Sequence, residues 1–145
     1  MYKHLLIATD GSELAQKAID QGLALAKALD ARATAITVTE PWTAAVYGEA
    51  VMAFSVDDYE KTVEAGASKV LSIVNDAAKT AVVTCVTIHV KDRFPAEGII
   101  ETAKAYGCDL TVMASHGRRG LRRLILGTQA NEVVTQSTIP VLICR

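Results

Sequence analysis

The segment Asp-Leu-Thr-Val-Met-Ala-Ser-His-Gly-Arg-Arg-Gly-Leu-Arg-Arg-Leu-Ile-Leu-Gly-Thr-Gln-Ala, residues 109–130, determines how the rest of the sequence is interpreted. It opens with an apolar run at 110–114, which is typical of a parallel strand buried on both faces. Three glycines and four arginines follow, and apolar residues at 130, 133 and 134 then recur at helical spacing. Glycines let a backbone approach a ligand closely, and free N–H groups at a helix start attract anions. The segment therefore predicts the phosphate half of a nucleotide site.

Length and composition favour one α/β domain. The chain has 145 residues, of which 50% are hydrophobic and 5% aromatic, and this is enough for a substantial core. We expect residues 1–145 to form a single domain. With 15 Lys and Arg against 16 Asp and Glu, the formal net charge is -1. Domains that bind nucleic acid or acidic membranes are usually basic, so the charge argues against both partners.

The cysteines and the N-terminus indicate a reducing compartment. Cys85, Cys108 and Cys144 are odd in number, far apart and without metal-binding spacing. Each lies in or beside an apolar run, where a buried thiol is the expected role. The apolar run near the N-terminus is too short for a signal peptide or a membrane span. These features predict a cytoplasmic protein without a membrane span.

Strand-like and helix-like segments alternate along the chain. Strands are expected at 4–9, 33–39, 82–90, 110–114 and 140–144, and helices at 13–29, 57–80, 96–106 and 128–136. The alternation predicts right-handed crossovers and a mainly parallel five-stranded sheet with helices on both faces. Ligands bind such sheets outside the carboxyl ends of the strands. Residues 8–12, 38–42 and 114–128 should therefore meet at one edge.

Asp10 is the first candidate ligand residue, because it follows the first expected strand. Its carboxylate could hold a metal–phosphate group or a ribose hydroxyl. Alternatively, it is a turn residue beside Gly11, with Ser12 as the cap of the following helix. The position at a strand's carboxyl end, together with the distant glycine loop, favours the ligand role.

The polar residues of the 109–130 segment also have two interpretations. The arginines at 118, 119, 122 and 123 form the one dense charge cluster, and guanidinium groups suit phosphates. A solvated loop would have the same composition. His116 could donate to a phosphate or be an ordinary loop residue, whereas His4 and His89 lie in strand runs and are expected to be structural.

Several familiar nucleotide and catalytic patterns are not met. The sequence contains no Gly-x-x-x-x-Gly-Lys-Ser/Thr and no Gly-x-Gly-x-x-Gly after the first strand. A phosphorelay receiver needs clustered acids, a phosphoacceptor and a lysine at fixed strand ends, and here Asp10 and a misplaced Asp92 are the only acids available. No Ser/His/Asp or Cys/His assembly is predicted, so hydrolysis of a bound nucleotide should be slow at most.

Three stretches resemble the universal stress protein family, and the resemblance covers the whole chain. They are Ile-Ala-Thr-Asp-Gly-Ser at 7–12, Val-Met-Ala-Ser-His-Gly at 112–117, and Leu-Gly-Thr at 126–128 with Ile-Pro-Val-Leu-Ile at 139–143. The resemblance implies an open parallel sheet of order 3-2-1-4-5, similar to the adenine nucleotide alpha hydrolases. It also implies a protein of the ATP-binding branch that acts in stress response or regulation.

The ATP-binding branch has Gly, two residues, Gly, nine residues, then Gly-Ser/Thr. Nine residues separate Gly117 from Gly127, and Thr128 follows, but Ala114 occupies the first glycine position. An extended strand-end residue can be alanine without strain. The substitution would close the site only if position 114 needs a positive φ or a closer approach to the ligand.

The resemblance assigns roles to individual positions. Ala8, Thr9 and Asp10 would line the ribose and metal side, with Asp10 the candidate for a magnesium ion. Val38 would offer backbone groups to adenine, and Met113 and Ala114 would pack on the nucleoside. The phosphates of ATP, ADP or AMP would be surrounded by Ser115, His116, Gly117, Gly127, Thr128 and Gln129, with Arg118 as a weaker addition.

The resemblance also implies a homodimer in which the final strands, Val141, Leu142, Ile143 and Cys144, pair across a two-fold axis. An apolar edge strand would otherwise risk aggregation. One alternative is an adenylyl-transferase or hydrolase on the same frame. The other is a nucleotide-independent dimeric interaction module, whose surface for an unidentified partner protein would be residues 42–56 with their aromatic side chains.

Overall fold

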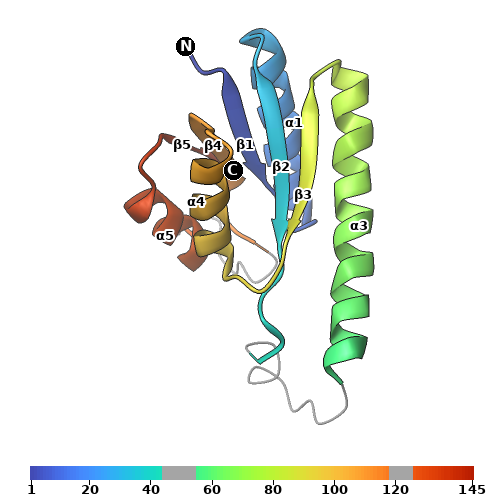
Figure 1. The fold of residues 1–145 in the computed structure, drawn as a ribbon. Coiled ribbons are helices and arrows are strands. Elements are labelled where there is room, and N and C mark those ends of the chain that lie inside the picture. The colour runs from blue at the N-terminus through green and yellow to red at the C-terminus, as the bar shows by residue number, and fades with distance from the viewer. Residues whose placement is uncertain (44–54, 118–125) are drawn as a thin grey trace.

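The computed structural model describes residues 1–43, 55–117 and 126–145 (Figure 1). The elements in chain order are β1 His4–Ala8, α1 Glu13–Ala28, β2 Arg32–Val38, α3 Val56–Ala81, β3 Cys85–Val90, α4 Pro95–Ala105, β4 Leu110–Ala114, α5 Thr128–Gln136 and β5 Val141–Cys144. The predicted alternation of strands and helices is confirmed. None of the helices in these ranges is long and apolar enough to cross a membrane.

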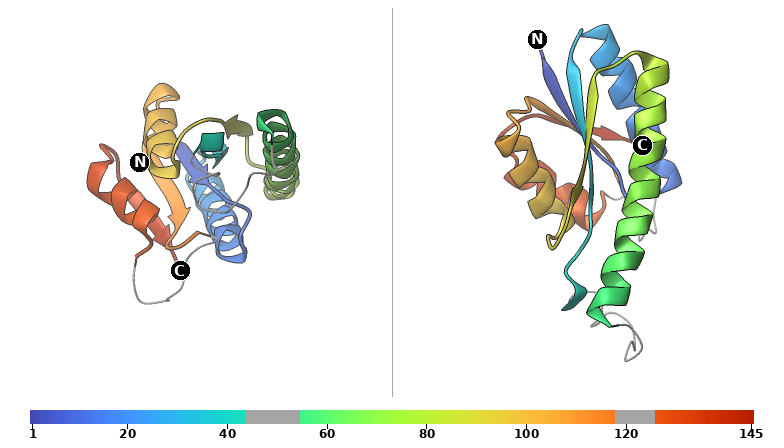
Figure 2. Two further views of the ribbon diagram at one scale, coloured as in Figure 1. Left: turned by 90° about the horizontal axis from the view of Figure 1, so that it is seen from below. Right: turned by 45° about the vertical axis from the view of Figure 1, so that its right-hand side comes forward.

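The five strands form one sheet of order β3-β2-β1-β4-β5, and each neighbouring pair is parallel. The expected order 3-2-1-4-5 is therefore confirmed. Helices α1 and α3 cover one face and α4 and α5 cover the other, as Figure 2 shows when the sheet is seen from below. Both faces of the central strands are buried, which explains why β1 and β4 consist mostly of apolar residues.

The start of β3 differs from the prediction, which placed it at residue 82. Helix α3 continues to Ala81, and Val82 forms its C-cap in the left-handed conformation, with φ 58°. The strand therefore begins at Cys85, because the residues before it complete the helix end. At the other end of α3, the Ser55 hydroxyl accepts the N–H of Asp58 (3.2 Å) and begins the helix.

Two apolar cores fix the helices on the sheet. On the α1–α3 face, buried residues such as Leu5, Ile19 and Val74 pack together. On the α4–α5 face, Leu6 and Ile36 pack in a second cluster with residues of both helices. Burial of these side chains supplies the main driving force for the arrangement.

Helix α4 lies especially close to the sheet because a glycine faces it. A Cβ added at Gly98 would lie 2.9 Å from Cγ1 of Val38 and 3.3 Å from Cγ1 of Val90. Any side chain at this position would therefore move the helix or the strands. The close contact places the start of α4 beside the carboxyl end of β2.

The strand order reverses on either side of β1, since β2 lies on one side and β4 on the other. Open α/β sheets bind ligands at such a switch point, outside the carboxyl ends of the strands. The loops after β1 and β4 diverge there. This is the end of the molecule at which the starts of α4 and α5 also lie (Figure 1).

Candidate functional site

A cleft of about 560 Å³ opens at the carboxyl ends of β1, β2 and β4. Its volume lies within the range of about 300–1,000 Å³ found for small-molecule sites. Eleven of the residues predicted from the sequence line it: Ala8, Thr9, Asp10, Val38, Met113, Ala114, His116, Gly117, Gly127, Thr128 and Gln129. The structure therefore brings together segments that are more than a hundred residues apart. Arg118 and the other three arginines lie outside the described residues.

Asp10 both shapes the turn after β1 and faces the cleft. Its Oδ1 accepts the N–H of Ser12 (2.9 Å), and the hydroxyl of Thr9 accepts the N–H of Gly11 (3.2 Å). Gly11 has a φ of 79°, which glycine adopts without strain. The turn role is thus present, and the carboxylate is also part of the cleft wall.

The backbone of Val38 faces the cleft because β1 ends before it reaches this residue. The last pair between β1 and β2 joins Ala8 to Ile36, and the carbonyl of Ile36 accepts the N–H of Thr9 (2.9 Å). Backbone polar groups alternate sides along a strand, so those of Val38 point to the same side as those of Ile36. At Val38 no residue of β1 is paired with these groups, so they face the cleft.

The chain after Val38 is held from β3 and α3. The Thr39 hydroxyl and Nε2 of His89 are 2.9 Å apart, and Tyr59 donates its O–H to the carbonyl of Glu40 (2.7 Å). Burial, followed by the charge of Lys91, lowers the pKa of His89. His89 is therefore bonded within the fold and is absent from the described lining of the cleft, and so is buried His4, which lies 2.8 Å from the hydroxyl of Thr34.

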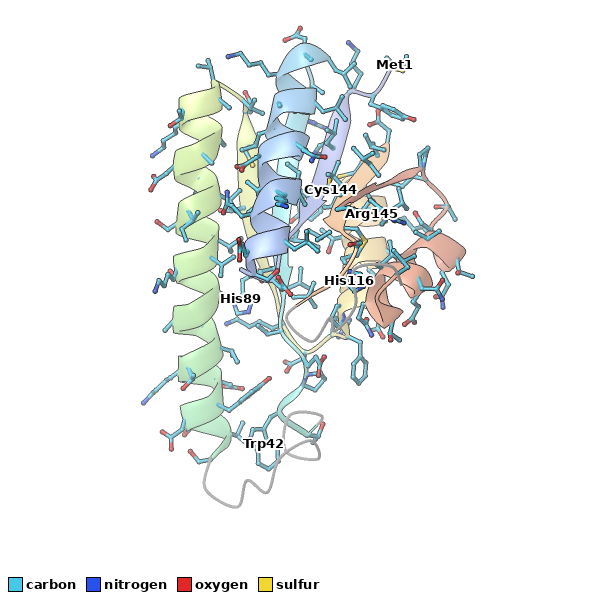
Figure 3. All side chains as sticks on the ribbon, turned by 180° about the vertical axis from the view of Figure 1, so that it is seen from behind. Met1, Trp42, His89, His116, Cys144 and Arg145 are labelled. Carbon is cyan, nitrogen blue, oxygen red and sulfur yellow. The ribbon has the colours of Figure 1, made fainter. Side chains whose placement is uncertain are left out.

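Ser115 lies beneath the cleft and organises the loop after β4. It is 4% exposed, its N–H donates to the carbonyl of Cys144 (2.9 Å), and its carbonyl accepts the N–H of Gly127 (2.8 Å). Its hydroxyl lies 2.9 Å from Nδ1 of His116. Ser115 is absent from the described lining of the cleft, and its backbone N–H is already used by β5. In Figure 3, His116 lies below Cys144 and Arg145 in this view.

The two glycines of the loop are required for space. A Cβ on Gly117 would lie 2.8 Å from Oδ2 of Asp10, and one on Gly127 would lie 3.0 Å from the carbonyl oxygen of Ser115. Both glycines have ordinary φ values, since neither appears among the described residues with positive φ. Close approach of the chain to itself, rather than a special conformation, therefore explains these glycines.

The start of α5 presents free donors to the cleft. Gly127 is the N-cap and has no side chain to cap the helix. The first helical hydrogen bond runs from the N–H of Asn131 to the carbonyl of Gly127 (2.8 Å). The N–H groups of Thr128, Gln129 and Ala130 precede it and are left without helical partners. All three residues line the cleft, and the helix dipole adds partial positive charge there.

An apolar wall was missed by the sequence analysis. The cleft is also lined by the apolar residues Ala15, Ile36, Pro95, Ile99, Leu126 and Ala130, and by Glu40. Pro95 and Ile99 come from α4, a helix to which the sequence assigned no part in the site. The apolar face of α4 and the proline at its start were visible in the sequence. Neither feature indicated that the start of this helix lies beside the point where the strand order reverses.

The cysteines take no part in the cleft. Burial raises the pKa of all three thiols, that of Cys108 to about 11. Protonated thiols are poor nucleophiles and poor metal ligands. Among the described residues, no cluster of His, Cys, Asp or Glu has the arrangement of a metal site.

A model of the universal stress protein family matches residues 1–145. This chain belongs to the universal stress protein family. Universal stress protein YxiE of Bacillus subtilis (strain 168) is 32% identical over 152 residues, which span 100% of both chains. The family resemblance seen in the sequence is thus confirmed over the whole length of this universal stress protein.

Two solved structures extend the comparison. A universal stress protein in complex with cAMP has a TM-score of 0.70 and 24% identity, covering 99% of this chain and 97% of its own. A universal stress protein from Archaeoglobus fulgidus in complex with dAMP has a TM-score of 0.73 and 13% identity, covering 99% and 98%. At these identities the likeness shows a shared fold.

Proposed function

We propose that this universal stress protein binds an adenine nucleotide, ATP, ADP or AMP, in the cleft. The start of α5 carries the proposal, because the three residues that begin the helix with N–H groups free of helical partners line a cleft of about 560 Å³. Such a helix start binds phosphate through its backbone and its dipole. The cAMP and dAMP complexes of two universal stress proteins support an adenine nucleotide as the ligand.

The cleft has a different chemistry at its two ends, and this sets the proposed orientation. At the β2 end, the backbone of Val38 offers one donor and one acceptor, which suit the edge of adenine. Ile36, Pro95 and Ile99 line the cleft with apolar atoms, and these suit the faces of a purine ring. The phosphates then lie at the start of α5, with His116 and the hydroxyl of Thr128 as further donors.

The loop after β1 completes the proposed site. Asp10 follows β1 in the cleft wall and would accept a hydrogen bond from a ribose hydroxyl. With ATP it would also be the ligand for a magnesium ion, which prefers carboxylate and phosphate oxygens. The fit is chemical, since an acceptor-only carboxylate suits both a hydroxyl and a hard cation.

Ala114 is compatible with binding. It lies in β4, pairs with Cys144 of β5, and is not among the described residues with positive φ. Position 114 thus has an extended backbone that alanine adopts without strain. This removes one of the two conditions under which alanine would close the site; the other is the approach of the ligand to the alanine methyl group.

We also propose a homodimer through β5 and a regulatory role in the cytoplasm. Strand β5 is at the edge of the sheet, Leu142 is 37% exposed, and Val134 of α5 is 46% exposed. An apolar edge strand is stabilised by pairing with a second copy. The three unpaired cysteines suit a reducing compartment. The homodimer is tested by sedimentation of the wild type and of Leu142→Lys, because a charged side chain on the edge strand should make the variant monomeric.

The nucleotide proposal is tested by thermal melting with ATP–Mg, AMP and GTP. A ligand that binds only the native state stabilises it by about 2.7 kcal/mol at a hundredfold excess over Kd. We expect the melting temperature to rise with the adenine nucleotides and to stay constant with GTP. A folded dimer that shows no shift with any of them would contradict the proposal and favour the nucleotide-independent interaction module.

A further inference from the structure

The side chain and the backbone of Gln129 have different partners: the backbone N–H belongs to the proposed phosphate site, whereas the side chain contacts α4. Gln129 is the second residue of α5, so its N–H is one of the three free donors at the helix start. Its side-chain oxygen Oε1 instead accepts the backbone N–H of Ala96, at 3.0 Å. One residue therefore touches both helices that border the cleft.

Helix α4 depends on this contact at its first turn. Its N-cap residue, Phe94, makes no side-chain cap, and Pro95 has no N–H. The first helical bond runs from the N–H of Gly98 to the carbonyl of Phe94 (2.9 Å), so the N–H of Ala96 has no partner in its own helix. Ala96 is 1% exposed, and a buried donor without a partner is costly. Gln129 supplies the acceptor from another helix.

The turn that Gln129 holds is the apolar wall of the cleft. Pro95 and Ile99, on either side of Ala96 along the chain, both line the cleft. On its inner side, α4 already contacts Val38 so closely that Gly98 leaves no room for a methyl group. The position of the wall across the cleft is therefore fixed by the sheet on one side and by Gln129 on the other.

We propose that Gln129 is a positioning residue for the nucleobase. Its amide oxygen holds the wall that contacts the base, and its backbone N–H serves the phosphate end of the same ligand. This inference rests on the proposed adenine nucleotide site. It implies that removing the amide oxygen weakens binding of the base and leaves binding of phosphate groups unchanged.

The experiment compares three variants with two probes. Gln129→Met keeps the length of the side chain and removes the acceptor, whereas Gln129→Glu keeps an acceptor. Gln136→Met makes the same change at the exposed end of α5 and is the control. The probes are adenosine, which has no phosphate that a glutamate would repel, and inorganic triphosphate, which has no base. Amide exchange of Ala96, measured without ligand, reports the contact itself.

We expect Gln129→Met to bind adenosine about fivefold more weakly, the size of a lost helix cap, and to bind triphosphate as the wild type does. Exchange at Ala96 should accelerate in this variant only, and Gln129→Glu should restore both adenosine affinity and protection. A purely structural role would lower the melting temperature without separating the two probes, and that result would overturn the inference. Wild-type protein that binds neither probe would instead refute the proposed function itself, while exchange at Ala96 would still report the contact.

Discussion

Helices α4 and α5 begin beside each other at the same edge of the sheet, yet the N–H groups of their first turns have different partners. Neither has a capping side chain of its own, since the N-cap residues are Phe94 and Gly127. At α4, the buried N–H of Ala96 is bonded to Gln129. At α5, the corresponding groups line the cleft.

The partners of the first N–H groups decide whether a helix start stabilises the fold or binds a ligand. A helix start whose donors are satisfied from within the protein contributes stability and a rigid wall. A start whose donors face a cleft keeps its partial positive charge for an incoming anion. In this protein the closed start at α4 borders the base end of the proposed site, and the open start at α5 borders the phosphate end.

Closing the space at the open start should have the largest effect. In Gly127→Val, the new Cβ would meet the carbonyl oxygen of Ser115 at 3.0 Å and Cα of His116 at 3.4 Å. Because both are backbone neighbours, the start of α5 must move. We expect ATP affinity to fall by about a hundredfold, since each hydrogen bond to a charged group is worth about 1.5–3 kcal/mol. Calorimetric titration measures the loss.

Gly117→Val is the companion variant. Its Cβ would meet the side chain of Asp10, at 2.8 Å, and a carboxylate can rotate where a backbone cannot. We expect binding to be lost here as well, with a smaller loss of stability than in Gly127→Val. Circular dichroism should show the native helix content in both. Unchanged ATP affinity in both variants would place the phosphate elsewhere.

Moving the closed helix should have the next largest effect. A methyl group at Gly98 meets Val38 at 2.9 Å, whereas one at Gly66 of α3 has no atom within 4 Å. Both positions gain about 0.5–1 kcal/mol of helix propensity on substitution by alanine, but overpacking costs about 1–3 kcal/mol at Gly98. Urea unfolding should therefore show Gly66→Ala stabilised and Gly98→Ala destabilised. The opposite order would mean that α4 does not depend on its contact with β2.

A helix that caps itself provides the third comparison. The Ser12 hydroxyl accepts the N–H of Ala15 (3.2 Å) at the start of α1. Ser12→Ala should lower the free energy of unfolding by about 1 kcal/mol, much as Gln129→Met does for α4. Adenosine affinity should stay at the wild-type value, because Ser12 is absent from the described lining of the cleft. A loss of affinity equal to that of Gln129→Met would remove the distinction between the two caps.

A helix end at the opposite edge of the sheet should have the smallest effect. Val82 closes α3 with a φ of 58°, which is strained for a β-branched residue, and its side chain is 81% exposed. Val82→Gly should raise the free energy of unfolding by about 0.5–1 kcal/mol by relieving this strain. Nucleotide affinity should not change. A destabilised variant would show that the valine side chain contributes more than its backbone costs.

The fold could largely be predicted because its signals are local. The apolar run at 110–114 and the helical spacing from 128 to 136 gave β4 and α5 with the bounds that the structure has. The start of β3 was wrong because Val82 has strong strand preference, and the helix end overrode it. The bonds that close this helix end are local, from the N–H of Val82 to the carbonyls of Ala78 and Lys79, but glycine rather than valine is the usual residue in a left-handed helix end.

The candidate site could be predicted in part, through the family resemblance. The alternation of strands and helices placed Asp10, Val38 and the loop glycines at one edge, the resemblance gave each of them a role, and the structure brings them into one cleft. The wall from α4 was missed because it depends on a crossover. The hydrogen bond between Gln129 and Ala96 joins positions 33 residues apart, so no local sequence pattern predicts it. Nor could the sequence show that Ser115 is bonded to Cys144 and Gly127, whereas its neighbours Ala114 and His116 line the cleft.

The most direct test of the open start is an NMR titration of the intact protein with AMP. If the start of α5 holds the phosphate, the backbone amides of Thr128, Gln129 and Ala130 should show the largest shifts, and the same protein titrated with adenosine should show them weakly. The N–H of Ala96 should stay protected from exchange with either ligand, because it is already bonded to Gln129. Shifts confined to other segments, with these three amides unmoved at saturation, would contradict the assignment of the phosphate to α5.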